Sequence, residues 1–199
     1  MPKARNLLLF LVFSLAALFE PGSAGAHPQT RNGFLVGFGV GGGSAGVDIP
    51  QVSDFGFTDG RNGGVSGNFR IGYAFRPDLA VHLETSSWLK EEDDITLTLS
   101  VVSAAVTFYP KSSGFFVRGG VGFGTSWFGF ADSLLVLGDV TVTKNETGFG
   151  LLGAAGYELR LTPMFAMGPQ VEYAYLFVEG DFVDAANVVS GSLQFTWYW

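Results

Sequence analysis

The alternation of residues 65–75, VSGNFRIGYAF, constrains the fold of this chain more than any other feature. Its odd-numbered residues are mostly large and apolar, and its even-numbered residues are small or polar. Successive side chains of a β-strand point to opposite faces, so this pattern predicts a strand with two chemically different sides. Pro77 and Asp78 then predict a tight turn, and alternation resumes at Leu79.

The same unit recurs and predicts eight antiparallel strands with uncertain ends. They are expected at roughly 33–43, 65–75, 79–88, 95–109, 115–127, 147–161, 164–177 and 187–199. Short connections (76–78, 110–114, 162–163) alternate with mostly longer, more polar ones (44–64, 89–94, 128–146, 178–186). Short periplasmic turns and long outer loops are typical of outer-membrane barrels.

Two of these strands contain an irregularity that predicts a β-bulge. Pro169 lies inside 164–177 and has no N–H for the sheet. In 95–109 the apolar side switches near Val101 and Val102.

The composition favours a barrel that faces lipid. The chain is 47% hydrophobic and only 15% charged, whereas soluble domains carry about 25% charged residues. No segment after residue 26 has 18 consecutive apolar residues, so membrane-spanning helices are not expected. The chain has no cysteine, which excludes disulfides and thiolate metal sites.

Residues 1–26 have the layout of a cleaved signal peptide. Lys3 and Arg5 precede the apolar run 7–19, and Ala24-Gly25-Ala26 supplies the small residues of a cleavage site. The run is shorter than the roughly 20 residues of a spanning helix, so a retained anchor is the less favoured alternative. Residues 27–199 are then the barrel.

The last strand ends in alternating large side chains. Leu193, Phe195, Trp197 and Trp199 share one face. This ending resembles the carboxyl-terminal signal by which outer-membrane barrels are recognised for assembly; an ordinary interfacial aromatic girdle is the alternative.

Over residues 27–199 the chain resembles the small eight-stranded outer-membrane proteins, the group of the opacity proteins, outer membrane protein X and the membrane domain of outer membrane protein A. The glycine-rich segments GFLVGFGVGGG and FFVRGGVGFG look like strands of that group. The resemblance implies an all-β, eight-stranded, antiparallel up-and-down transmembrane β-barrel. It also implies a bacterial outer-membrane location, with lipid, lipopolysaccharide and the assembly machinery as partners and without a cofactor.

The predicted inner face carries glycines and balanced charges. Gly37, Gly39, Gly41, Gly120, Gly122 and Gly124 are expected to face a narrow interior. The charged and titratable residues expected there are Arg70, His82, Glu84, Arg118, Glu158, Arg160 and Glu172. Arg70 and Glu84 are equidistant from Pro77 and should face each other. These charges would form either a plug of ion pairs, which we favour, or the selectivity constriction of a channel.

The expected outer connections are acidic, with 13 Asp and Glu residues against three Lys and Arg residues. This charge excludes nucleic acid as a partner and would repel anionic glycolipids unless divalent cations bridge them. Glu91, Glu92, Asp93 and Asp94 are weak candidates for such bridging, although a solvated polar loop is the simpler interpretation. Arg31, Arg76 and Lys111 are expected on the periplasmic side.

Residues 130–143 predict a hairpin with its turn at Gly138-Asp139, protruding from the membrane. It resembles the protruding sheet of outer membrane protein X, and its edge could pair with a strand of a host or cell-surface ligand.

The favoured function is therefore a non-enzymatic structural or surface-interaction role. A narrow channel for ions or small solutes is the alternative. A lipid A-modifying enzyme is less favoured, because the two histidines, His27 and His82, are not expected near the outer leaflet.

Overall fold

The structure is a computed structural model that describes residues 31–48, 61–92, 95–132, 140–177 and 185–199. The predicted signal peptide, Asp93, Asp94 and the turn at 138–139 lie outside these residues. Within the described part, no helix is long and apolar enough to cross a membrane.

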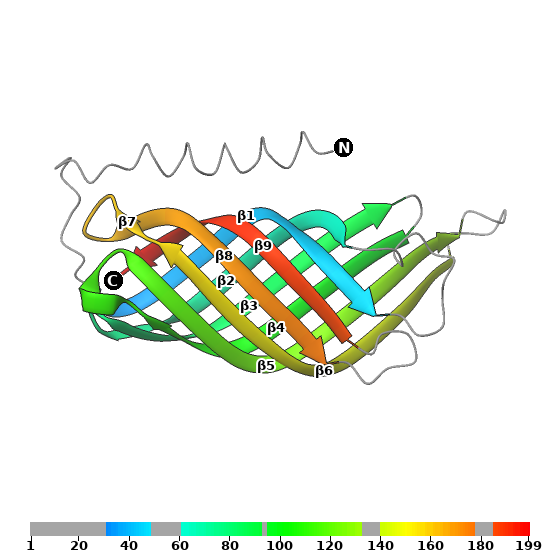
Figure 1. Ribbon diagram of the computed structural model, residues 1–199, viewed down its shortest axis with the longest axis horizontal. Helices are drawn as coiled ribbons and strands as arrows, with labels where there is room; N and C mark the ends of the chain where they lie inside the picture. The colour runs from blue at the N-terminus through cyan, green and yellow to red at the C-terminus, as the bar shows by residue number, and fades with distance from the viewer. Residues whose placement is uncertain (1–30, 49–60, 93–94, 133–139, 178–184) are drawn as a thin grey trace.

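Eight antiparallel strands form one closed wall, as predicted (Figure 1). The elements are β1 (Gly33–Asp48), β2 (Asn62–Arg76), β3 (Leu79–Glu92), β4 (Ile95–Phe108), η1 (Pro110–Ser112), β5 (Phe115–Asp132), β6 (Val140–Tyr157), β7 (Leu159–Arg160), β8 (Phe165–Phe177) and β9 (Ala185–Tyr198). Each strand pairs with its neighbour in sequence, and β1 pairs with β9 to close the barrel. The two-residue β7 continues β6 along the same edge of β8.

Several strands extend further than predicted at the end opposite the short turns. β3 reaches Glu92 and β4 starts at Ile95, so the expected loop 89–94 is mostly strand. β5 and β6 pair as far as Asp132 and Val140. The two strands therefore continue into the predicted hairpin.

Neither predicted bulge is present. Pro169 pairs with Leu193 in an unshifted register, and the wall is instead interrupted at Glu158, between β6 and β7. Pro169 lies opposite Tyr157 of β6 and has no N–H. One hydrogen bond of the ladder between β6 and β8 is therefore missing next to Glu158. The register shift that the described ladders do contain lies between Ala74 and Arg76, beside the turn.

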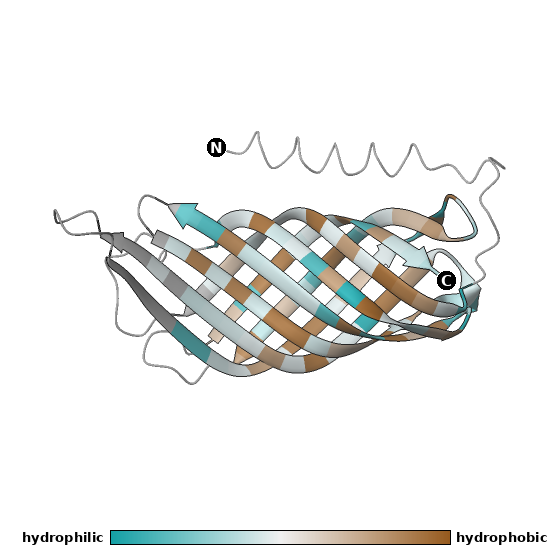
Figure 2. Cartoon of the chain, turned by 180° about the vertical axis from the view of Figure 1, so that it is seen from behind, coloured by the Kyte–Doolittle hydropathy of each residue, from teal (hydrophilic) through white to brown (hydrophobic). Residues whose placement is uncertain are grey.

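The two faces of the wall differ as the alternation predicts. Outward side chains such as Phe123, Val65 and Phe75 are 61–70% exposed and form an apolar band, while inward ones are buried. Figure 2 shows this difference as alternating brown and pale bands along the strands. The band is the surface expected of a barrel that contacts lipid.

The polarity of the wall reverses in the half of β4 far from the short turns. Leu97, Leu99 and Val101 point inward and are buried, whereas Thr98 and Ser100 point outward. Side chains of β4 alternate between the two faces without a break. The apolar side chains change from the outer to the inner face at residues 101 and 102 because the interior is apolar beyond that point. This part of β4 lies beyond the apolar outer band and faces an apolar interior.

Candidate functional site

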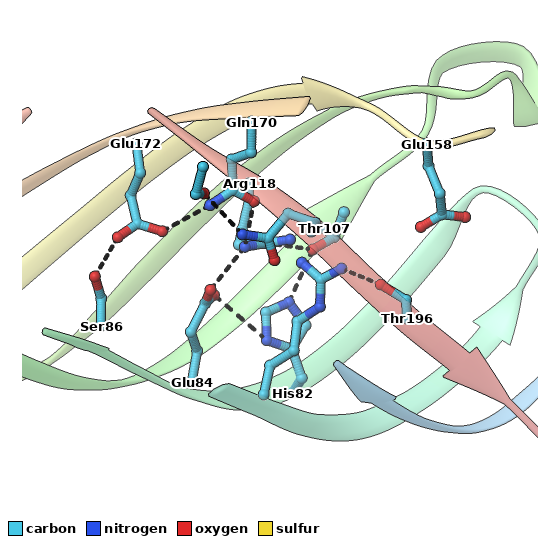
Figure 3. Close-up of polar contacts among 12 residues, drawn as sticks. His82, Glu84, Ser86, Thr107, Arg118, Glu158, Gln170, Glu172 and Thr196 are labelled. Carbon is cyan, nitrogen blue, oxygen red and sulfur yellow. Dashed lines mark hydrogen bonds and ion pairs between the residues drawn. The ribbon is translucent and has the colours of Figure 1, made fainter. Parts of the chain in front are cut away.

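The middle of the barrel holds a central cluster of polar side chains around Glu84, Arg118, Thr107 and Gln170 (Figure 3). Nη1 of Arg118 lies 2.7 Å from Oε1 of Glu84 and donates to Oε1 of Gln170 at 3.0 Å. Nε of Arg118 donates to Oγ1 of Thr107 at 3.1 Å. All four side chains are buried, so this is an ion pair removed from water and held by neutral partners.

The central cluster continues to Glu172 and His82. Nε2 of Gln170 donates to Oε2 of Glu172 at 2.8 Å, and Ser86 donates to the other carboxylate oxygen. Nε2 of His82 lies 2.8 Å from Oγ1 of Thr107. Polar groups from β3, β4, β5 and β8 are thereby joined across the interior.

A second group surrounds Glu158 at the end with the short turns, and we call it the periplasmic cluster after the side on which those turns are predicted. Its carboxylate accepts from Nε of Arg31 at 2.8 Å and from the hydroxyls of Tyr198 at 2.8 Å and Tyr109 at 3.2 Å. The Arg31 guanidinium lies 3.6 Å from the centre of the Tyr109 ring. These contacts connect the residues before β1 to the last strand.

Burial and the Glu158 carboxylate raise the pKa of Tyr109 to about 12, so its hydroxyl stays protonated and can donate. Burial acts to lower the pKa of Arg31, but Glu158 and the two tyrosines outweigh it and the pKa is raised. Arg31 therefore stays charged.

Arg160 and Arg70 are also inside. Arg160 lies 4.3 Å from the centre of the Tyr198 ring and donates to the carbonyl of Pro163 at 2.7 Å. Nη2 of Arg70 donates to Oγ1 of Thr196 at 2.5 Å, and its side chain packs over Gly37.

The interior end farthest from the short turns is filled by a buried apolar plug. The plug consists of Ala45, Trp88, Leu97, Leu99, Val101, Ala174, Leu176, Ala186 and Val188. Inward glycines make room for its larger members. A Cβ at Gly64 would lie 2.7 Å from the Trp88 ring, and one at Gly124 would lie 2.9 Å from Leu176.

The seven predicted inner residues are all buried inside the barrel, but they do not form one network. Arg70 and Glu84 thus face each other across β2 and β3 as predicted, but the expected ion pair between them is replaced by the one with Arg118, from β5. Glu158 and Arg160 belong to the periplasmic cluster, whereas His82, Glu84, Arg118 and Glu172 belong to the central cluster.

Sequence reasoning missed Arg31, which it placed on the periplasmic surface. Arg31 is fully buried, so the buried charges among the described residues are four arginines against three glutamates rather than three of each. Tyr109, Tyr198 and Thr107 were also missed. Thr107, Tyr109 and Tyr198 lie at inward positions of the predicted strands 95–109 and 187–199, and Arg31 is reached by extending the first strand two residues before Gly33.

Two solved structures of outer-membrane proteins are similar to this barrel. Neisserial surface protein A matches with a TM-score of 0.60 and 16% identity, covering 85% of this chain and 99% of that one. Ail, the attachment invasion locus protein of Yersinia pestis, in complex with the heparin analogue sucrose octasulfate, matches with a TM-score of 0.55 and 16% identity, covering 83% and 98%. The fold is that of a small outer-membrane β-barrel.

No protein-family model and no curated protein sequence matches the chain. The outer-membrane barrel fold and its apolar outer band indicate the bacterial outer membrane as the location. The short turns are predicted on the periplasmic side, and with that orientation the apolar plug lies toward the cell surface.

The terminal residues of this outer-membrane barrel contribute to its closing seam. Trp199 N donates to Phe34 O at 2.9 Å, and Phe34 N donates to Trp199 O at 3.1 Å. On the outer face, Trp197 lies 5.7 Å from Phe38 and 4.8 Å from Phe165 between ring centres. Leu193 and Phe195 lie on the same face. Recognition of these residues by the assembly machinery stays a prediction.

The described residues contain no group of three or more acidic or histidine side chains that could hold a metal ion. Glu91 and Glu92 belong to the end of β3. Cation bridging at this end of the barrel stays a prediction, since half of the acidic run lies outside the described residues.

Proposed function

We propose that this outer-membrane barrel is non-enzymatic, does not conduct, and acts at the cell surface. The observation that carries the proposal is the filling of its interior at three successive levels. The periplasmic cluster, the central cluster and the apolar plug follow one another along the barrel. An ion would have to cross buried ion pairs and then an apolar segment, which is unfavourable for a charged solute.

Conductance tests the proposal directly. The refolded chain without residues 1–26 is expected to be silent in planar bilayers, with heat-modifiable gel migration confirming that it has folded. A variant with Trp88→Ala, Leu99→Ala and Leu176→Ala removes the bulk of the plug and should conduct measurably more. Discrete openings of the unmodified chain would contradict the proposal and favour a narrow channel with Arg70, Glu84 and Arg118 at its constriction.

The position of His82 supports a non-enzymatic role. Thr107, His82 and Glu84 are arranged like the hydroxyl, base and acid of a catalytic triad. However, Nδ1 of His82 lies 3.7 Å from Oε2 of Glu84, beyond hydrogen-bond distance. Thr107 also accepts from Arg118, and all these groups are buried within the barrel. A lipid substrate outside the wall has no contact with them.

The acidic outer segments favour a cationic or neutral surface partner. The Ail structure contains a polysulfated ligand, whereas the expected outer connections of this chain carry 13 acidic residues against three basic ones. A polyanion would be repelled by such a surface. The pairing of β5 and β6 out to Asp132 and Val140 supports an arm for this interaction.

Deletion of residues 130–143 tests the surface role. The shortened barrel is expected to fold, because β5 and β6 retain ten or more paired residues below the deletion. Its binding to host surfaces or partner cells should fall at least about tenfold, which corresponds to losing about 1.4 kcal/mol of binding free energy. Binding equal to that of the full chain would remove the support for this arm.

A further inference from the structure

The outer face of β3–β6 carries a row of hydroxyl groups just above the apolar band. Direct pairing across four strands aligns Ser87, Ser100, Thr125 and Thr147. The Ser87 and Ser100 hydroxyl oxygens are 2.9 Å apart, and Thr147 is exposed. Neighbouring strands are about 4.8 Å apart, so the row is a regular array of donors and acceptors.

On β4–β6 the row directly follows exposed apolar side chains of the lipid-contacting surface, while on β2 and β3 that surface continues past it with Val65 and Leu89. The outward residues immediately below it are Thr85, Val102, Phe123 and Phe149, and the last three are exposed apolar side chains of the band. One step along a strand to the next outward residue is about 6.6 Å. The hydroxyl row is therefore the next outward step after the lipid-contacting side chains of β4–β6.

Trp127 stands in the next row, between Thr98 and Asn145. A Cβ at Gly129 would lie 2.7 Å from Cη2 of Trp127, so the indole ring lies along the wall over this glycine. The outward residue before Trp127 on β5 is Thr125, so the indole ring has hydroxyl and amide side chains on three sides. An indole ring among uncharged hydroxyl and amide groups matches a sugar ring, which combines an apolar face with a rim of hydroxyls.

We propose that this face, formed by Ser87, Ser100, Thr125, Thr147, Trp127 and Asn145, binds the core saccharide of the glycolipids that surround the barrel. The proposal rests on the outer-membrane location of the barrel. The named side chains are uncharged, so they contact sugar rings without the repulsion that the acidic outer segments exert on phosphate groups. Membrane-anchored sugars are favoured over free sugars because the face continues directly from the lipid-contacting band.

The test compares the chain in three kinds of phosphatidylglycerol vesicle at one Mg²⁺ concentration: without additive, with lipid A, and with rough lipopolysaccharide that carries the core saccharide. We expect the midpoint of heat unfolding, measured by gel migration, to be higher by about 3 °C or more with rough lipopolysaccharide than with lipid A. Trp127→Ala and Thr125→Val/Thr147→Val should each lose most of this difference.

The valine variant keeps β-branched shape and sheet propensity, so it folds even if Trp127→Ala does not. Asn187→Ala is the matched control: Asn187 faces outward on β9, on the opposite side of the barrel, and this variant should keep the full difference. Equal midpoints in lipid A and rough lipopolysaccharide would overturn the inference, while insertion and silence in bilayers would leave the proposed function standing. If soluble core oligosaccharide added to lipid A vesicles raised the midpoint of heat unfolding equally, the claim that the bound sugar is membrane-anchored would be overturned.

Discussion

Replacing Arg118 by methionine is expected to lower the free energy of unfolding by about 3–5 kcal/mol. The substitution leaves Glu84 buried without its cation and removes the donor to Gln170 and Thr107. Urea unfolding of the barrel in phospholipid vesicles, followed by gel migration, measures the change.

Two variants sharpen this experiment. Glu84→Met combined with Arg118→Met should cost less than the sum of the single changes, by about 1–3 kcal/mol, because neither charge is then stranded. Arg76→Met is the exposed control: Arg76 pairs with Asp78 at 2.9 Å outside the barrel, and its loss should cost about 0–1 kcal/mol. Equal losses of unfolding free energy for Arg118→Met and Arg76→Met would contradict the buried ion pair between Arg118 and Glu84.

Replacing Gly122 by valine is expected to destabilise the barrel by about 3 kcal/mol or more, at the upper end of overpacking effects. A Cβ at this inward position would lie 1.9 Å from the carbonyl oxygen of Val102 on β4. Backbone of a neighbouring strand cannot rotate away as a side chain can, so the β4–β5 pairing must shift. The fraction of folded chain on gels after refolding measures the loss.

Gly119→Val is the matched control on the same strand. Gly119 faces outward, and a Cβ there meets nothing within 4 Å. The added side chain joins the apolar band and has high strand propensity, so refolding should be unchanged or improved. Similar refolding yields for the two variants would contradict the claim that inward positions such as Gly122 have no room for a side chain.

The sequence predicted the eight strands, their two faces and the inward glycines, because these follow from local backbone geometry. A strand places alternate side chains on opposite faces whatever surrounds it, and Pro77 and Asp78 mark a turn without help from distant residues. The buried position of all seven predicted inner residues follows from the same alternation.

Closure of the barrel decided what those inner residues contact. The register of β2 and β3 follows from one turn and sets Arg70 opposite Glu84, but the carboxylate is reached by Arg118 from β5. Arg31 and Tyr198 likewise meet at Glu158 although they come from opposite ends of the chain. The apolar plug was mistaken for a bulge because Leu97 and Leu99 looked misplaced on a single strand. Sequence periodicity fixes which way a side chain points, whereas the partners it finds inside depend on long-range contacts that exist only once β1 and β9 have joined.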